Sequence, residues 1–233
     1  MTEGLQVFPV RGIDEIARGD DLAGIIAAHV TLAHHDVVVV TQKIVSKAEG
    51  RMVEVDAEDP RARLALVAAE SVRELRRRDD LVISETKHGF VCANAGVDLS
   101  NVDAGWAALL PEDPDRSARR IRDGLRAATG LDVAVIVSDT FGRPWRKGLT
   151  DVAIGCAGIA AIVDLRGTLD DRGRELFATE VCVVDEIAGA AELVMGKASG
   201  IPVAVVRGAE DEWFRPSSVR DEIVRPPGED LFR

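Results

Sequence analysis

Runs of hydrophobic residues predict several strands that are covered on both faces. Residues 36–41, Asp-Val-Val-Val-Val-Thr, are mostly β-branched and show no alternation with polar positions. This pattern is typical of a strand buried on both sides. Similar runs at 131–137 and 201–206 predict two more buried strands, and a further strand is expected around 178–184.

Apolar residues at helical spacing predict helices between these strands. Asp59-Pro60 and Asp113-Pro114 each look like an N-cap followed by proline at the first helical position. The expected apolar stripes are Leu64, Ala68, Val72 and Leu75 in the first helix, and Ala118, Ile121, Leu125 and Ala128 in the second. Residues 76–78, all arginine, would end the first helix, and Gly130 would cap the second.

The remaining segments complete a mixed α/β fold. A third helix is expected from Asp185 to Met195, and residues 209–233 should form a mostly irregular tail. Alternating strands and helices favour a mixed α/β architecture, and no linker or repeat divides residues 1–233, so one domain is expected.

Composition and charge narrow the functional classes. The formal net charge is −11, and aromatic residues are scarce (six Phe, three Trp and no Tyr), so a nucleic-acid or anionic-lipid partner is not expected. The longest uncharged apolar run, residues 152–163, is about half the roughly 20 residues that a membrane span needs. The first 30 residues show no secretory signal and the three cysteines form no CxxC pair, which indicates a cytosolic protein with reduced thiols.

Residues 138–148, Ser-Asp-Thr-Phe-Gly-Arg-Pro-Trp-Arg-Lys-Gly, carry the strongest chemical signal. They follow a predicted strand and should therefore lie at its carboxyl end. Magnesium-assisted phosphoryl transfer needs hard oxygen ligands, here Asp139 and Thr140, and fixed positive charge, here Arg143 and Arg146. The alternative is that Asp139 begins a turn and that the basic residues lie on a solvated surface.

Two other segments allow a functional or a purely structural interpretation. Within residues 94–101, Asp98 is a candidate metal carboxylate and Asn101 a candidate nucleotide contact, although Asn, Gly and Asp also form ordinary loops. The two lysines within residues 41–47 could hold phosphates or simply form an exposed edge. Residues 189–197 resemble a P-loop only superficially, because the glycine spacing is wrong.

Together these segments resemble the coenzyme F420-0:gamma-glutamyl ligase family. The resemblance runs in one unbroken order through residues 5–208. The matching stretches are GDDL at 19–22, VVVVTQKIVSKAEGR at 37–51, GFVCANAGVDLSN at 89–101, LLPEDPDRSARRIRDGL at 109–125, VIVSDTFGRPWRKG at 135–148, AIGCAG at 153–158, DEIAGAAELVMGK at 185–197 and IPVAVVRG at 201–208. It implies mixed sheets in two interlocked subdomains, and a homodimer with the active site near the dimer contact.

The resemblance also implies an activity and a set of site residues. Members of the family join L-glutamate to a carboxylate of the deazaflavin F420 precursor, using GTP and two Mg²⁺ or Mn²⁺ ions; the γ-phosphate would form an acyl phosphate that the glutamate amine attacks. By resemblance, Asp98 and Asp139 bind one ion and the Thr140 hydroxyl belongs to the other. The catalytic residues expected are Asp139, Thr140, Arg143 and Arg146. The positions that match GTP contacts are Ile13, Asp14, Glu15, Ile16, Gln42, Lys47, Asn101, Met195, Gly196 and Ala198.

One departure and two alternative functions accompany this interpretation. Lys197 stands where archaeal members carry a metal-binding Glu, and a protonated lysine cannot bind a cation, so either substrate oxygens hold the second ion or Lys197 supplies the charge. Actinobacterial relatives often carry a C-terminal flavin-binding domain that residues 1–233 do not include, so we expect either a free-standing ligase or one domain of a longer product. The alternatives are a nucleotide-dependent ligase or kinase for another carboxylate, and a catalytically silent nucleotide-binding partner domain; the two aspartates and the hydroxyl together favour an enzyme.

Overall fold

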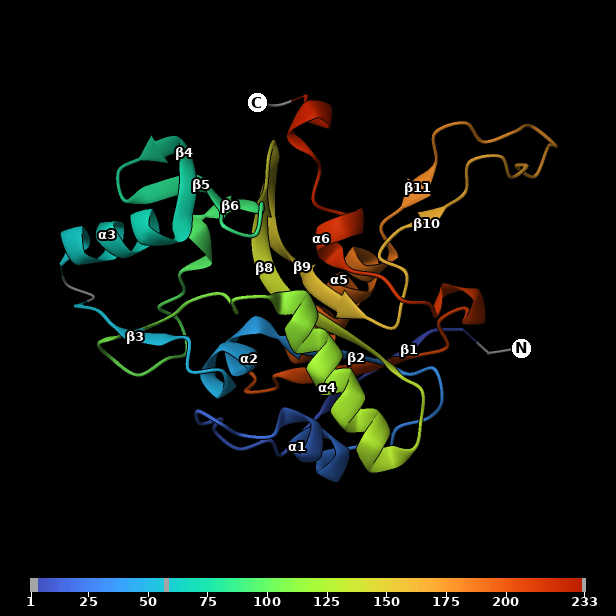
Figure 1. Ribbon diagram of the computed structural model, residues 1–233, viewed down its shortest axis with the longest axis horizontal. Helices are drawn as coiled ribbons and strands as arrows, with labels where there is room; N and C mark the ends of the chain where they lie inside the picture. The colour runs from blue at the N-terminus through green and yellow to red at the C-terminus, as the bar shows by residue number, and fades with distance from the viewer. Residues whose placement is uncertain (1–3, 57–58, 232–233) are drawn as a thin grey trace.

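A five-stranded sheet forms the centre of the computed structural model, which describes residues 4–56 and 59–231 (Figure 1). The strand order is β1-β12-β2-β8-β9, and neighbours are antiparallel except for the parallel pair β2 and β8. The fold is therefore mixed α/β, as predicted. The strands are β1 (Gln6–Val10), β2 (Val37–Thr41), β8 (Ala134–Arg143), β9 (Arg146–Ala157) and β12 (Val203–Arg207).

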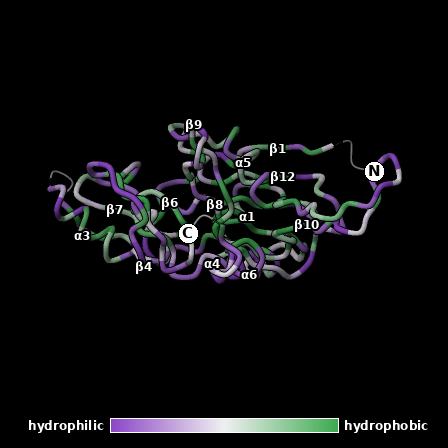
Figure 2. The backbone as a smooth tube through the Cα atoms, turned by 90° about the horizontal axis from the view of Figure 1, so that it is seen from above, coloured by the Kyte–Doolittle hydropathy of each residue, from purple (hydrophilic) through white to green (hydrophobic). Residues whose placement is uncertain are grey.

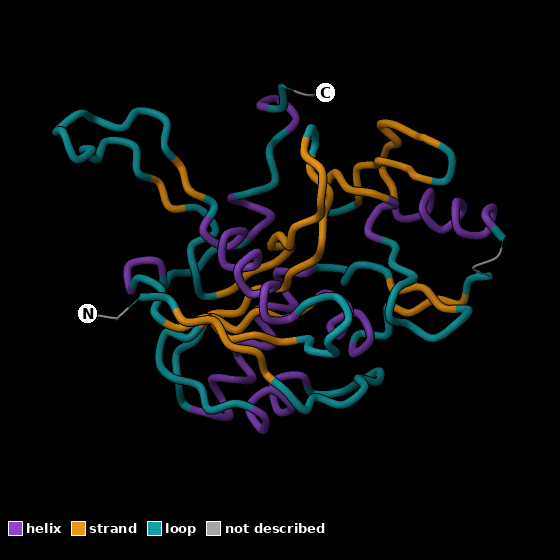
Figure 3. The backbone as a smooth tube through the Cα atoms, turned by 180° about the vertical axis from the view of Figure 1, so that it is seen from behind, coloured by secondary structure: helices purple, strands orange, loops and turns teal. Residues whose placement is uncertain are grey.

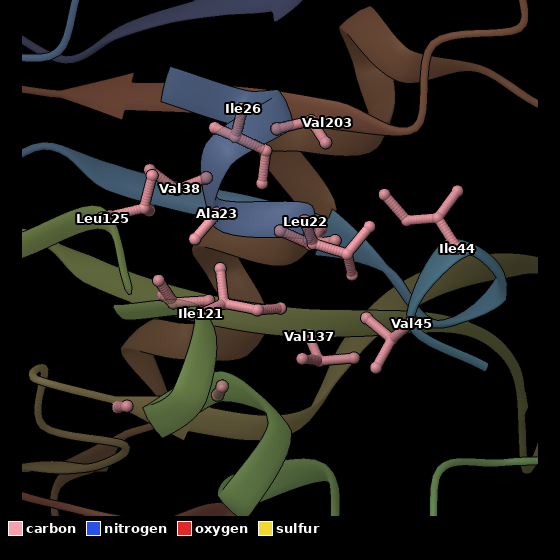
Figure 4. Close-up of a cluster of buried hydrophobic side chains, with 14 of the residues drawn as sticks. Leu22, Ala23, Ile26, Val38, Ile44, Val45, Ile121, Leu125, Val137 and Val203 are labelled. Carbon is pink, nitrogen blue, oxygen red and sulfur yellow. The ribbon is translucent and has the colours of Figure 1, made fainter. Parts of the chain in front are cut away.

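Helices on both faces of this sheet explain the unbroken hydrophobic strands. Because side chains alternate along a strand, Val38 and Val40 face one core and Val37 and Val39 face the other. The first core contains the helices on one side of the sheet, and Figure 4 shows Ile26 and Leu125 packed near Val38. On the opposite face of the sheet, the second core contains the buried residues of one long helix. These helices are α1 (Leu22–His29), α2 (Gln42–Ala48) and α4 (Pro114–Thr129) on the first face, and α5 (Val183–Met195) on the second.

The predicted start and end of α4 are both confirmed. The Asp113 carboxylate accepts a hydrogen bond from the Arg116 backbone N–H (2.8 Å), and Gly130 ends the helix with φ +72°. Ala118, Ile121 and Leu125 are buried in the first core, as the apolar stripe predicts. The stripe stops there, because Ala128 is exposed.

The first predicted helix is correct at its start and wrong at its end. Asp59 caps α3 (Pro60–Glu70), but the chain then changes to a strand, β4 (Ser71–Arg78). Val72, predicted to face a core, is 67% exposed, and the arginines 76–78 lie on the strand. Antiparallel pairing with β5 (Leu81–Thr86), which itself pairs with β6 (Val91–Ala93), overrides the helical spacing. Figure 2 shows β4 as a hydrophilic stretch at one end of the molecule.

Two small sheets and a tail complete the fold. Strand β3 (Met52–Glu54) pairs with β7 (Trp106–Ala108), and β10 (Val163–Asp164) pairs with β11 (Glu180–Val181) in an arm that projects from the body (Figure 3). The strand predicted around 178–184 is thus only two residues long, because α5 begins at Val183 and not at the predicted Asp185. The tail carries only short turns and α6 (Val219–Glu222), as predicted, with 232–233 outside the described residues. Among the helices described, none is long and apolar enough to cross a bilayer.

Strand β8 extends well beyond the end of its neighbour β2, and the candidate functional site lies at this point. The last residue of β2, Thr41, pairs with Ser138, and α2 starts immediately afterwards. Strand β8 continues to Arg143 as a hairpin with β9. Residues 138–140 therefore lie within a strand and not at its end, contrary to the prediction. Ser138 pairs with the last residue of β2, and Asp139 and Thr140 lie just beyond the point where the sheet loses its β2 neighbour.

Candidate active site

A cavity of about 490 Å³ opens at the point where β2 ends. Segments that are distant in the sequence line it, and most of the predicted site residues are among them. The lining residues are Ile13–Ile16, 41–44, Lys47, Asp98, Ser100, Asn101, 138–140, Asp151, Glu192, 196–198 and 200–202. The structure therefore brings most of the predicted site residues together around one cavity.

Strand β8 divides this cavity into two sides. Val135 and Val137 face the first core, so Asp139, two residues further on, lies on the same face, together with Asp98 on the cavity wall. We call this the Asp98–Asp139 side. Ser138 and Thr140 lie on the opposite face of the strand, which we call the Thr140 side.

On the Asp98–Asp139 side, the two carboxylates have different environments. Lys43 Nζ lies 2.7 Å from Asp98 Oδ2, and the Ser100 backbone N–H donates to Asp98 Oδ1 (2.7 Å). Burial acts to raise the pKa of Asp98, but these bonds outweigh it and hold the pKa below its ordinary value. Burial and the charges of Asp98 and Asp151 raise the pKa of Asp139 to about 7, against the opposing effects of the Thr140 N–H and Lys197.

On the Thr140 side, a buried carboxylate organises two hydroxyl groups. Asp151, directly opposite Thr140 in the hairpin, is 3% exposed. Its two oxygens accept hydrogen bonds from Ser138 Oγ (2.9 Å) and Thr140 Oγ1 (2.5 Å). The ammonium of Lys197 donates to the same Thr140 oxygen. Burial and the charge of Asp151 raise the pKa of Glu192, and Lys197 opposes this rise.

A second set of contacts holds the loops over the cavity. Gly196, with φ +62°, ends α5 and directs residues 197–198 toward the cavity. The Asn101 side-chain amide donates to the Lys197 carbonyl (3.2 Å), and Asn101 itself has φ +51°. At the rim, Lys47 forms an ion pair with Glu15. Three loops, which contain Glu15, Asn101 and Lys197, and helix α2 therefore meet at the cavity.

Gln42 has a structural role that the sequence did not reveal. Its side chain is 2% exposed, and its amide nitrogen donates to Ser46 Oγ (2.6 Å) and the Leu109 carbonyl (2.9 Å). A nucleotide contact through this nitrogen would have to replace these buried bonds.

Three predicted residues lie away from the cavity. Met195 is 0% exposed in the second core, because its side chain faces the sheet; Glu192 and the residues after Met195 reach the cavity. Arg143 and Arg146 pair with each other at the hairpin tip, and both are exposed. Since β8 and β9 continue past Thr140, the turn carries these arginines beyond the cavity of the chain that bears them.

Two cavity residues were missed by the sequence reasoning. Asp151 could not be assigned to the site without the register of the hairpin. Its position in a strand after a tight turn was the one signal that could have suggested it. Glu192 lies on α5 four residues before Gly196, so helical spacing toward the predicted segment 195–202 could have found it.

The oxygens of the Asp98–Asp139 side fit a divalent cation. Two carboxylates close enough to raise a pKa by mutual repulsion are stabilised when a cation lies between them. Within the described residues, no group of three or more His, Cys, Asp or Glu side chains is gathered as a complete metal site. One or two carboxylates together with substrate phosphates and water are a common ligand set for Mg²⁺.

Comparisons with known proteins match this chain to a family. The family model for F420-0:Gamma-glutamyl ligase matches residues 12–208. The coenzyme F420:L-glutamate ligase of Methanopyrus kandleri is 43% identical over an alignment of 248 positions, which covers 98% of each chain. The protein of the same name from Methanothermobacter thermautotrophicus is 40% identical over an alignment of 251 positions, which covers 99% of each chain. That from Methanocaldococcus jannaschii is 39% identical, over 99% of this chain and 95% of its own. The chain therefore belongs to the F420-0:gamma-glutamyl ligase family.

Proposed function

We propose that this chain is a GTP-dependent ligase that joins L-glutamate to the carboxylate of the deazaflavin precursor F420-0. The relatives above carry the name coenzyme F420:L-glutamate ligase and match almost the whole chain. The observation that carries the proposal is the meeting of Asp98, Asp139 and Thr140 in one cavity with Lys43 and Lys197 beside them. This combination suits a substrate that bears phosphate groups.

The proposed reaction has two steps. The carboxylate oxygen of the precursor attacks the γ-phosphorus of GTP, which forms an acyl phosphate and releases GDP. The glutamate amine then attacks the acyl carbon, inorganic phosphate leaves, and the nitrogen loses a proton to give the amide. Further rounds would add γ-linked glutamates to the same product.

Residues of this chain would position the reactants and balance charge. Asp98 and Asp139 would hold the divalent cation, which when bound neutralises phosphate oxygens. Lys43 keeps the Asp98 carboxylate ionised and oriented. Asn101 and the loop after Gly196 border the cavity and are the proposed nucleotide contacts.

Mass spectrometry of the deazaflavin product tests this proposal. Incubation with F420-0, L-glutamate, GTP and Mg²⁺ or Mn²⁺ should give products heavier by whole glutamyl units, and EDTA or omission of GTP should stop the reaction. ATP sustaining the full rate would contradict the guanine preference. Absence of any glutamyl product would contradict the substrate and favour a ligase or kinase for another carboxylate.

A matched pair of variants tests the cation site in the same assay. Asp139→Asn keeps the size of the side chain but removes its charge, so turnover should be lost while the fold remains. Asp171→Asn removes a charge from the exposed β10–β11 arm and should leave turnover unchanged. Near-normal turnover by the Asp139 variant would contradict its role as a ligand.

We also propose that the chain assembles as a homodimer, as the family resemblance implies. The tip of the β8–β9 hairpin exposes Trp145 and Leu149, which are 86% and 67% exposed. Contact between copies would cover these side chains and would give Arg143 and Arg146 a partner surface. Light scattering after gel filtration measures the mass; a monomer at micromolar concentration would contradict this proposal.

A further inference from the structure

On the Thr140 side of the cavity, the protein itself supplies a positive charge, the ammonium group of Lys197. The Thr140 hydroxyl has a single proton, and it donates this proton to Asp151 (2.5 Å). Its lone pairs are therefore left for a positively charged group, and the Lys197 ammonium occupies that place. Asp151 is buried and fixed by a second donor, Ser138, so the direction of the Thr140 hydroxyl is set by the fold.

Lys197 differs from the other two lysines of the cavity. Lys43 and Lys47 are ion-paired with Asp98 and Glu15, whereas Lys197 contacts a neutral hydroxyl. An ammonium has three donors, so after the bond to Thr140 two remain for a ligand. The Lys197 backbone is held by Asn101, which keeps the side chain at the cavity.

The negative charges on the Thr140 side also favour a positive group between the protein and a bound nucleotide. Asp151 and Glu192 are both carboxylates that line the cavity beside Thr140. A polyanionic nucleotide would be repelled by them unless positive charge stands between. Lys197 is close enough to oppose the rise in the pKa of Glu192 that burial and Asp151 cause.

We propose that Lys197 is a built-in cation for phosphate oxygens on the Thr140 side, so that a single divalent ion, at Asp98 and Asp139, completes the site. This inference rests on the proposed function, because it requires a phosphate-bearing substrate. Asp151 and Thr140 act as positioning residues: Asp151 turns the hydroxyl, and the hydroxyl holds the ammonium.

Counting ions by native mass spectrometry tests the inference. The chain is mixed with Mn²⁺ and a non-hydrolysable GTP analogue, and manganese is counted in the nucleotide-bound species. The wild-type chain should carry one ion. Lys197→Glu, which places a carboxylate beside Thr140 and Asp151, should carry two.

Nucleotide affinity provides the second readout. Lys197→Met should weaken binding of the analogue roughly 10- to 100-fold, the range expected for one hydrogen bond to a charged group. Lys197→Arg should retain most of the affinity, and Lys87→Met, which removes a surface lysine paired with Glu70, should not change it.

The outcomes separate this inference from the proposed function. Two manganese ions in the wild-type complex, one in the Lys197→Glu complex, or an unchanged affinity for Lys197→Met would overturn the role of Lys197 while the ligase remains. A wild-type chain that bound no GTP analogue would overturn both.

Discussion

Ionisation of Asp139 should control how tightly the site holds a divalent cation. Burial and the neighbouring carboxylates, Asp98 and Asp151, raise the pKa of Asp139 to about 7. A carboxylate must lose its proton to bind a metal. Between about pH 8 and about pH 6 the ionised fraction of such a group falls from about nine-tenths to about one-tenth, so the apparent Kd should rise about tenfold.

Calorimetric titration with Mn²⁺ at several pH values measures this effect. Wild-type affinity should fall as the pH is lowered through 7, and the bound ion should displace a proton. Asp139→Asn should bind weakly, with little pH dependence in this range, whereas Asp171→Asn should behave as wild type. Equal wild-type affinity at both ends of the range, or the same pH profile in Asp139→Asn, would refute the assignment of Asp139 as a ligand.

The same pKa predicts the direction of the stability change without metal. Asp139 has an ordinary pKa of 3.8 when unfolded and about 7 when folded. Within this window the folded chain holds more protons than the unfolded chain, so the contribution of Asp139 to the free energy of unfolding falls as the pH rises. In EDTA, Asp139→Asn should therefore gain in Tm relative to wild type as the pH rises to 8. Saturating Mn²⁺ should reverse the order, because it binds the wild-type fold.

Three further predictions concern the framework that positions the site. Asp36, 0% exposed, accepts two hydrogen bonds of 2.7 Å from Arg207; Asp36→Asn should lower the free energy of unfolding by about 2–4 kcal/mol in urea titrations, and a change below about 0.5 kcal/mol would contradict this. A Cβ at Gly155 would lie 2.3 Å from the Pro114 carbonyl carbon, so Gly155→Ala should cost about 1–3 kcal/mol or more, whereas Gly228→Ala, in open space, should not. Asp115 accepts from the backbone N–H groups of Cys156 (2.8 Å) and of 219–220 in the tail; Asp115→Ala should therefore speed proteolysis within residues 215–225, and unchanged protection would show that the tail is held by other contacts.

The secondary structure was predicted correctly from the sequence where local sequence patterns and tertiary packing favour the same element. The valines of β2 and the caps of α3 and α4 were found because burial on two faces and N-terminal capping leave clear local patterns. The C-terminal half of the first predicted helix failed because Val72 and the following arginines satisfy helical spacing but form a strand with β5. Pairing between β4 and β5 is a tertiary effect that a single helical window cannot show.

The sequence predicted residues that the structure gathers around one cavity, but it did not show how the cavity is divided. Motif reasoning brought Asp98, Asp139 and Asn101 together, and the structure places all three around one cavity. It did not show that β8 separates Asp139 from Thr140, because adjacent residues in a strand face opposite ways. It also extended the site to Met195, whose hydrophobic side chain is fully buried in the core.

Hairpin register explains why the Thr140 side could not be derived from the sequence. Asp151 lies opposite Thr140 because the pairing shifts twice in this hairpin, between Gly142 and Arg143 near the turn and between Val137 and Ser138, where one residue of β9 bulges. Without that shift the partner of Thr140 would be Val152, and the carboxylate would point to the other face of the sheet. The orientation of the Thr140 hydroxyl, and with it the contact to Lys197, therefore depends on irregularities in the backbone pairing. A one-residue insertion on either side of that bulge should move Asp151 to the other face and abolish this arrangement, even though every motif in the sequence would remain.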